Sequence, residues 1–147
     1  MIILPALEQD FEWIKVIQSE AGLPLWKPSS ASWVLGRSAF AIWQIASDEC
    51  ELLSIAVNAA ERGKGYAKAL MEHSHKEFAK QGVKKNFLEV RENNVAAISL
   101  YKKFGYEKIA ERKKYYADGE CAIVMTTSLL PSITLPHSIT VSPLPSK

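Results

Sequence analysis

A glycine-containing turn between an apolar run and an amphipathic helix constrains this chain more than any other sequence feature. Residues 52–57 are mostly apolar, and the segment 62–67 that follows has glycines at positions 63 and 65. Glycine adopts positive φ angles and lets a ligand approach the backbone closely. A helix that starts here presents its unpaired first-turn N–H groups at the positive end of its dipole. We therefore expect this turn to bind a phosphate or pyrophosphate group.

Two common nucleotide-binding motifs do not match this turn. A Walker loop requires the pattern GxxxxGK[ST], which the residues after Gly65 do not supply. The dinucleotide fingerprint GxGxxG requires a third glycine, but Lys68 occupies that position. The remaining pattern is Arg-x-x-Gly-x-Ala, running from Arg62 to Ala67. The alternative interpretation is that the glycines only turn a strand into a helix.

Hydrophobic periodicity and turn residues predict one mixed α/β domain over residues 1–130. Apolar residues at helical spacing predict helices at 7–21, 65–81 and 94–104. Apolar runs between turn signals predict strands at 1–4, 38–46, 50–57, 86–90, 106–116 and 120–128, with Asp118-Gly119 marking the last hairpin. The loop 23–37 is expected to hold at most one helical turn or a stub of strand and to line a substrate entrance. Residues 131–147 are rich in proline and serine and are expected to form an appendage.

Composition and charge narrow the possible functions. A chain of 147 residues can bury a core without disulfides or a structural metal, and Cys50 and Cys121 match no metal-ligand spacing. The start of the chain lacks a signal-peptide pattern and no apolar run is long enough to span a bilayer, so we expect a cytoplasmic protein. Residues 1–60 hold three basic and seven acidic residues, whereas residues 61–147 hold 15 and nine. This asymmetry indicates an anionic ligand on the second half, or else a solvated, lysine-rich helix face.

A second motif, Asn94-x-x-Ala97-x-x-Leu100-Tyr101, lies on the predicted helix 94–104. Asn94 and Tyr101 are two helical turns apart, so both can face one ligand, whereas Tyr101 taken alone would be interpreted as a core residue. This helix, the Arg-x-x-Gly-x-Ala turn and the strand residues 55–57 before it together resemble the GCN5-related N-acetyltransferases, the GNAT superfamily.

The resemblance implies a GNAT-like fold, in which a splayed, mixed but mostly antiparallel sheet of six to seven strands is flanked by about four helices. It implies acetyl-CoA as cosubstrate, direct transfer without a covalent enzyme intermediate, and no metal. Acetyl-CoA is expected to contact the strand before the turn, the turn itself and the later helix, through Ile55, Ala56, Val57, Arg62, Gly63, Lys64, Gly65, Tyr66, Ala67, Lys68, Asn94 and Tyr101.

Glu89 and Tyr101 are the expected catalytic pair. Within the superfamily the chain is most similar to the bacterial ribosomal-protein-alanine N-acetyltransferases, over residues 40–125, including Leu88-Glu89-Val90-Arg91. In that family the glutamate of this strand is the general base and the tyrosine of the Leu-Tyr pair is the general acid. An amine that attacks a thioester must lose a proton and the thiolate must gain one, and a peptide α-amine, which titrates near ~8, needs only a modest base. The alternative is that Glu89 only pairs with Arg91, which shares its strand face.

The expected acceptor is a protein N-terminal α-amine, with a small ribosomal protein as the expected partner. Tyr115 and Tyr116 resemble the part of the family that contacts the acceptor peptide, although adjacent aromatic residues also occur in ordinary packing. The chain is shorter than the family pattern before Phe40. Two alternatives therefore stay open, namely transfer to a small amine or lysine side chain, and a non-catalytic acyl-CoA-binding module. We expect no nucleic-acid or membrane contact, and a monomer or weak homodimer.

Overall fold

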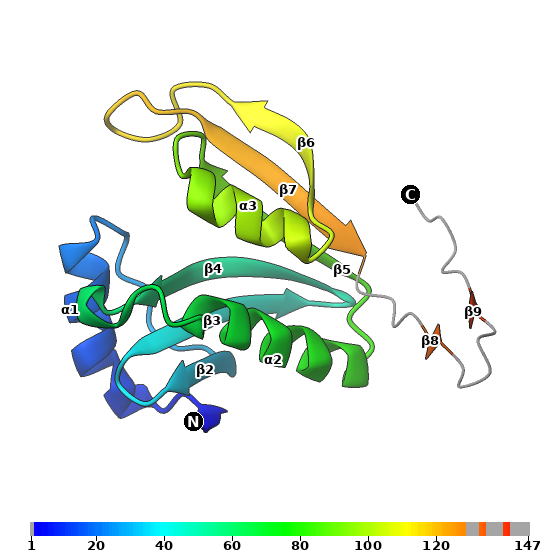
Figure 1. Cartoon of the computed structure of the whole chain (residues 1–147), viewed down its shortest axis with the longest axis horizontal. Coiled ribbons are helices and arrows are strands. Elements are labelled where there is room, and N and C mark those ends of the chain that lie inside the picture. The colour runs from blue at the N-terminus through cyan, green and yellow to red at the C-terminus, as the bar shows by residue number, and fades with distance from the viewer. Residues whose placement is uncertain (1, 129–132, 135–139, 142–147) are drawn as a thin grey trace.

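The chain mixes strands and helices, with three consecutive strands after the first helix, and the structure, a computed structural model, describes residues 2–128, 133–134 and 140–141 (Figure 1). The main sheet contains β1 (Ile3–Pro5), β2 (Ala31–Leu35), β3 (Ala39–Ala46), β4 (Glu49–Val57), β5 (Lys85–Arg91), β6 (Glu107–Arg112) and β7 (Ala122–Ser128). The helices are α1 (Phe11–Glu20), α2 (Tyr66–Lys80) and α3 (Val95–Lys103), with short 3-10 turns η1 (Glu8–Asp10) and η2 (Ala59–Glu61). Within these residues no helix is long and apolar enough to cross a membrane.

The sheet is mixed and mostly antiparallel, which confirms the expected fold class. Its strand order is β1-β2-β3-β4-β5-β7-β6, and β4–β5 is the parallel pair. That pairing joins Glu49–Glu51 to Lys85–Phe87, and beyond these residues β4 and β5 separate, so the sheet splays into two halves (Figure 1). Splaying exposes the edge of β4 that faces β5, at the end where β4 approaches the glycine turn.

A β-bulge in β4 lies where the two halves begin to separate. The register with β3 passes from Trp43 opposite Leu52 to Ile42 opposite Ser54, which makes Leu53 the extra residue. Bulges bend a strand and re-aim its side chains. Here Leu53 packs toward α1 and the adjacent Ser54 bonds a residue of α1, so two consecutive side chains point to the same face of the sheet.

Two apolar clusters hold helices against the two faces of this sheet. On one face, α2 and α3 pack over residues that include Trp43, Leu88 and Met125. On the other face, α1 packs through Ile14 and Ile17 against β2 and β3. The core is therefore continuous through both halves of the sheet on the α2–α3 face.

The helices agree with the prediction, whereas the first strands are more extensive than expected. The three α-helices in the described residues lie where periodicity predicted them, and two 3-10 turns accompany them. Pro24 and Pro28 remove backbone donors from the loop after α1, which forms no further helix. In the same loop only a stub of strand was predicted, but β2 is a five-residue strand buried along its whole length. It lies between β1 and β3, so tertiary pairing rather than local sequence forms it.

The last hairpin is confirmed, but its connection is longer than predicted. β6 ends at Arg112 and β7 begins at Ala122, so Tyr115 and Tyr116 lie in the connecting loop and not in a strand. The reason is local: Lys114 has a left-handed φ of 51°, and the N–H groups of Tyr115 and Tyr116 both bond the carbonyl oxygen of Glu120. This geometry interrupts the ladder and turns the tyrosines out of the sheet.

The prediction for the C-terminal appendage falls mostly outside the described residues. Two short strands of that segment are described, β8 (Ile133–Thr134) and β9 (Thr140–Val141), and they pair with each other. The sequence-based division at residue 130 stays a prediction.

Candidate active site

The glycine turn lies between the end of β4 and the start of α2. Gly63 and Gly65 have φ angles of 83° and 81°, a region that other residues adopt only with strain. A Cβ atom at either position would meet no protein atom within 4 Å. The first intrahelical bond runs from the Ala69 N–H to the Gly65 carbonyl, so the N–H groups of residues 66–68 precede it. The turn therefore offers open space beside a helix start, which fits a pyrophosphate.

Basic side chains surround this turn, and the first turn of α2 has no acidic residue. The Nζ atom of Lys64 lies 2.5 Å from the Glu61 carboxylate, an exposed hydrogen-bonded pair that raises the pKa of the lysine. Arg62 donates from Nε to the Val57 carbonyl at 3.4 Å and so connects the turn to the end of β4. Lys68 is exposed on the first turn of the helix. The residues present thus fit the pyrophosphate of acetyl-CoA.

A cavity of about 630 Å³ opens where β4 and β5 separate. Five of the predicted site residues line it, from β4, β5, α3 and the β6–β7 loop: Ile55, Glu89, Tyr101, Tyr115 and Tyr116. The loop after α1 forms part of its wall, as expected, through Leu23, Pro24 and Trp26. Residues that the sequence did not indicate also line it, chiefly Gln44, Glu51, Ser54 and Arg91. The cavity therefore joins the expected acid, base and acceptor residues in one space.

Glu89 projects from β5 into this cavity. Strand alternation places it opposite the buried Leu88 and Val90, as predicted. Its Oε2 atom lies 2.6 Å from Nε of Arg112 on β6, and its side chain is 22% exposed. The expected alternative partner, Arg91, instead holds Asp118 at 2.9 Å and lies 4.1 Å from the ring centre of Tyr116. The pairing hypothesis was therefore wrong about the partner, because the β6–β7 loop supplies an acid for Arg91.

Tyr101 reaches the cavity from α3. The side chain is buried, with 5% of its surface exposed, and its ring centre lies 5.8 Å from that of Tyr106. Burial raises the pKa of the Tyr101 hydroxyl far above its ordinary value, and the nearby Tyr116 raises it further. The hydroxyl is protonated at neutral pH, as that of an ordinary tyrosine also is, and this is the form that donates a proton.

The tyrosines of the β6–β7 loop form the outer wall. Tyr115 is 50% exposed, and hydrogen bonding to Glu89 together with its charge raises the pKa of the Tyr115 hydroxyl. Arg112 lies 5.7 Å from the Tyr115 ring centre, and Arg91 stacks on Tyr116. The predicted acceptor residues therefore stand directly beside Glu89.

The remaining predicted acetyl-CoA residues lie outside the cavity lining. Ala56 and Val57 continue β4 toward the glycine turn, and residues 62–68 form that turn and the start of α2. Asn94 is the N-cap of α3, where its side-chain oxygen accepts a bond from the Ala97 N–H at 3.2 Å. Asn94 is thus occupied in capping, and a shared contact with Tyr101 stays a prediction.

Sequence reasoning missed the residue that holds the loop after α1 in place. Gln18 of α1 is completely buried, and its amide bonds the backbone N–H and carbonyl of Trp26, each at 3.2 Å. The same Nε2 atom donates to the Ser54 hydroxyl of β4 at 3.1 Å. A polar residue within an apolar helical stripe is the only signal that the sequence offered.

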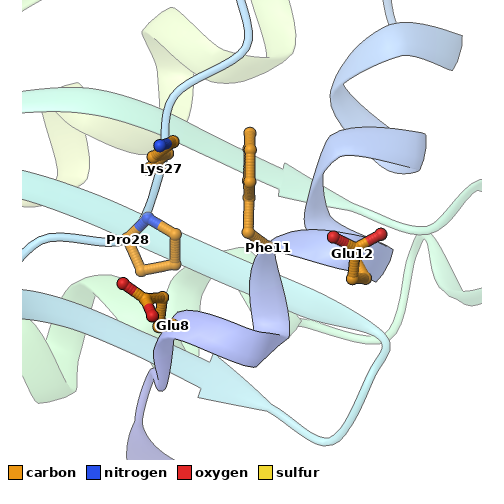
Figure 2. Close-up of a pocket in the computed structure, with 5 residues that line it drawn as sticks. All are labelled: Glu8, Phe11, Glu12, Lys27 and Pro28. Atoms are coloured by element: carbon orange, nitrogen blue, oxygen red, sulfur yellow. The ribbon is translucent and has the colours of Figure 1, made fainter.

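Two other features of the described residues lie apart from this cavity. A smaller pocket of about 190 Å³ at the start of α1 is lined by Phe11 and Pro28 between charged side chains (Figure 2). A group of potential metal ligands, Glu92, Glu111 and Cys121, lies near the β6–β7 hairpin. Neither contains a residue that the sequence predicted for the site.

Comparisons with known proteins identify the family. The acetyltransferase (GNAT) family matches residues 11–106. A ribosomal protein bS18-alanine N-acetyltransferase from Escherichia coli K12 is 44% identical over 91 residues, which are 60% of this chain and 62% of that protein. The Haemophilus ducreyi protein of the same name is 33% identical over 140 residues, covering 84% of this chain and 97% of its own length.

The comparison with solved structures indicates the same family. The crystal structure of the ribosomal-protein-S18-alanine N-acetyltransferase from Escherichia coli superimposes with a TM-score of 0.78 and 32% identity, covering 88% of this chain and 94% of that one. The chain belongs to the GNAT family of acetyltransferases.

Proposed function

We propose that this protein transfers an acetyl group from acetyl-CoA to the α-amine of a protein that begins with alanine, as its relatives named for ribosomal protein bS18 do. The observation that carries the proposal is the placement of Glu89 and Tyr101. A carboxylate from β5 and a protonated hydroxyl from α3 line one cavity at the point where β4 and β5 separate. We place the protein in the cytoplasm, where ribosomal proteins are made and assembled.

Acetyl-CoA supplies the activated acetyl thioester. Its pyrophosphate binds the N–H groups of residues 66–68 and the side of the turn left open by Gly63 and Gly65. Lys64 and Lys68 add positive charge near the phosphates. Backbone groups along residues 55–57, on the edge of β4 that β5 leaves free, hold the acyl end. Asn94 and Tyr101 extend this contact along α3.

Proton transfer is divided between two side chains. Glu89 accepts the proton that the acceptor ammonium gives up, because an ionised carboxylate is a proton acceptor only. Tyr101 donates a proton to the leaving sulfur, since its buried hydroxyl stays protonated at neutral pH. The attacking nitrogen bonds the acetyl carbon as the carbon–sulfur bond breaks, and no enzyme side chain becomes acylated.

The acceptor peptide enters between the loop after α1 and the β6–β7 loop. Trp26 forms one wall and Tyr115 and Tyr116 form the other. Both walls are anchored, the first by Gln18 and the second by the pair Arg91–Asp118. An anchored entrance favours an extended peptide terminus over a bulky internal lysine loop.

An acceptor panel tests this proposal. The release of CoA thiol is measured with acetyl-CoA and an alanine-starting peptide, its N-terminally blocked, lysine-containing twin, or polyamines. We expect release only with the free α-amine. Turnover of the blocked peptide or of polyamines would replace the proposal by a lysine or small-amine transferase. Binding of acetyl-CoA without any turnover would favour a non-catalytic acyl-CoA-binding module.

A further inference from the structure

A second carboxylate, that of Glu51, lines the acceptor cavity beside Glu89. Glu51 is the last residue of β4 paired with β5, and the bulge at Leu53 follows it. It lies on the same sheet face as Glu89, opposite the buried Cys50 and Leu52. In the part of the chain that the structure describes, its carboxylate makes no hydrogen bond or ion pair, although it lines the cavity.

The charges at this end of the cavity do not balance. Glu51 and Glu89 supply two negative charges, and Arg112, bonded to Glu89, supplies one positive charge. Desolvation and the charge of Glu89 raise the pKa of Glu51, while the charge of Arg112 lowers it. The charge of Glu51 therefore interacts with those of Glu89 and Arg112. Arg91 does not compensate, because Asp118 holds it. The cluster therefore carries one excess negative charge and has room for one further cation.

An amine acceptor brings such a cation. A peptide α-amine with a pKa near ~8 arrives mostly as ammonium at neutral pH, and it must lose a proton before it attacks. If the ammonium first bonded Glu89, it would compete with Arg112 for the same carboxylate. Glu51 offers an unpaired carboxylate at the same wall, so the ammonium can bind without breaking the Glu89–Arg112 pair.

We propose that Glu51 is a specificity-determining residue that binds the acceptor's ammonium group and positions it beside Glu89. The inference rests on the proposed transfer to an amine and identifies which carboxylate recognises the cation. Glu51 binds, Glu89 receives the proton, and Arg112 keeps Glu89 oriented. Glu51 does not increase the affinity for a neutral or N-terminally blocked acceptor.

The test compares Glu51→Gln with Glu49→Gln, a control on the same strand that lies outside the cavity. With the alanine-starting peptide, we expect Glu51→Gln to raise KM about tenfold while kcat changes less than about twofold, as for the loss of one partly exposed charge contact. The KM of the wild type should rise with ionic strength, and that of Glu51→Gln should not. Glu49→Gln should behave as the wild type does.

A binding experiment separates this inference from the proposed function. Calorimetry on the protein saturated with CoA measures affinity for the free-amine peptide and for its N-acetylated twin. Preference for the free amine that disappears in Glu51→Gln supports the inference, even if the wild type turns over no acceptor. Turnover and preference that are unchanged in Glu51→Gln overturn the inference and leave the proposed function standing. A wild type with no preference for the free amine also overturns it.

Discussion

Replacing Gln18 with leucine should loosen the acceptor entrance and destabilise the fold. The side chain is completely buried in α1, and leucine has a similar size but no polar atoms. Three hydrogen bonds are lost, two to the backbone of Trp26 and one to the Ser54 hydroxyl. Ser54 lines the cavity but is only 7% exposed, so little water can replace the partner that its hydroxyl loses, whereas water reaches the more exposed Trp26.

The magnitude follows from these three bonds. We take about 1–2 kcal/mol for the hydroxyl left unpaired at Ser54 and about 0.5 kcal/mol for each bond that water replaces at Trp26, which gives a loss of roughly 2–3 kcal/mol. In a domain of this size that loss lowers Tm by roughly 5–10 °C. Because Trp26 walls the acceptor side and not the glycine turn, KM for the peptide should rise while acetyl-CoA affinity stays constant.

Thermal unfolding by circular dichroism, combined with steady-state kinetics, measures both effects. Gln9→Leu serves as the control, since Gln9 is exposed in η1. The reasoning is refuted if Gln18→Leu unfolds within about a degree of the control, or if acetyl-CoA affinity falls as much as peptide affinity.

Three further predictions follow from the site and the core. Tyr101→Phe should lower kcat about a hundredfold with acetyl-CoA affinity kept, because only the donated proton is lost, as rate and binding measurements will show. Glu89→Gln should reduce the rate most at low pH, where the acceptor is most protonated, as a rate–pH profile will show. Burial lowers the pKa of His75 from 6.5 to about 4, so the unfolded chain binds a proton that the native state lacks. The free energy of unfolding should therefore fall as pH drops from 6.5 toward 4, by at most about 3 kcal/mol.

Each of these predictions has a contradicting result. An unchanged kcat in Tyr101→Phe would remove its role as acid. Parallel pH profiles for Glu89→Gln and the wild type would remove the role of Glu89 as base. Urea unfolding between pH 4 and 7 measures the free energy of unfolding of the wild type and of His75→Gln. The same pH dependence in both proteins would show that His75 is not its source.

Local sequence predicted the elements that carry strong local signals. Helical periodicity identified α1, α2 and α3. Asn93 and Asn94 were both candidate caps for α3, and the structure uses Asn94. The glycine turn was predicted because Gly63 and Gly65 adopt positive φ angles that other residues avoid. Glu89 lines the cavity from a predicted strand and Tyr101 lines it from a predicted helix. Both were identified by their resemblance to a family motif.

Features formed by tertiary contacts were not predicted. β2 forms because two neighbouring strands pair with it, and the bulge at Leu53 depends on its register with β3. Arg112 was not expected as the partner of Glu89, because β6 and β5 are both paired with β7 and come together only in the folded sheet. The only sequence signal for Glu51 was that an acidic residue lies on the strand that leads into the glycine turn.

The most direct test of the central claim is to locate the acetyl group on the product. The purified protein is incubated with acetyl-CoA and an intact ribosomal protein that begins with alanine and contains lysines, and the product is fragmented in a mass spectrometer. We predict the mass of one acetyl group on the first residue and none on lysine side chains, with the yield reduced in Tyr101→Phe. Acetylation confined to lysines, or an unmodified first residue beside active consumption of acetyl-CoA, would contradict the account.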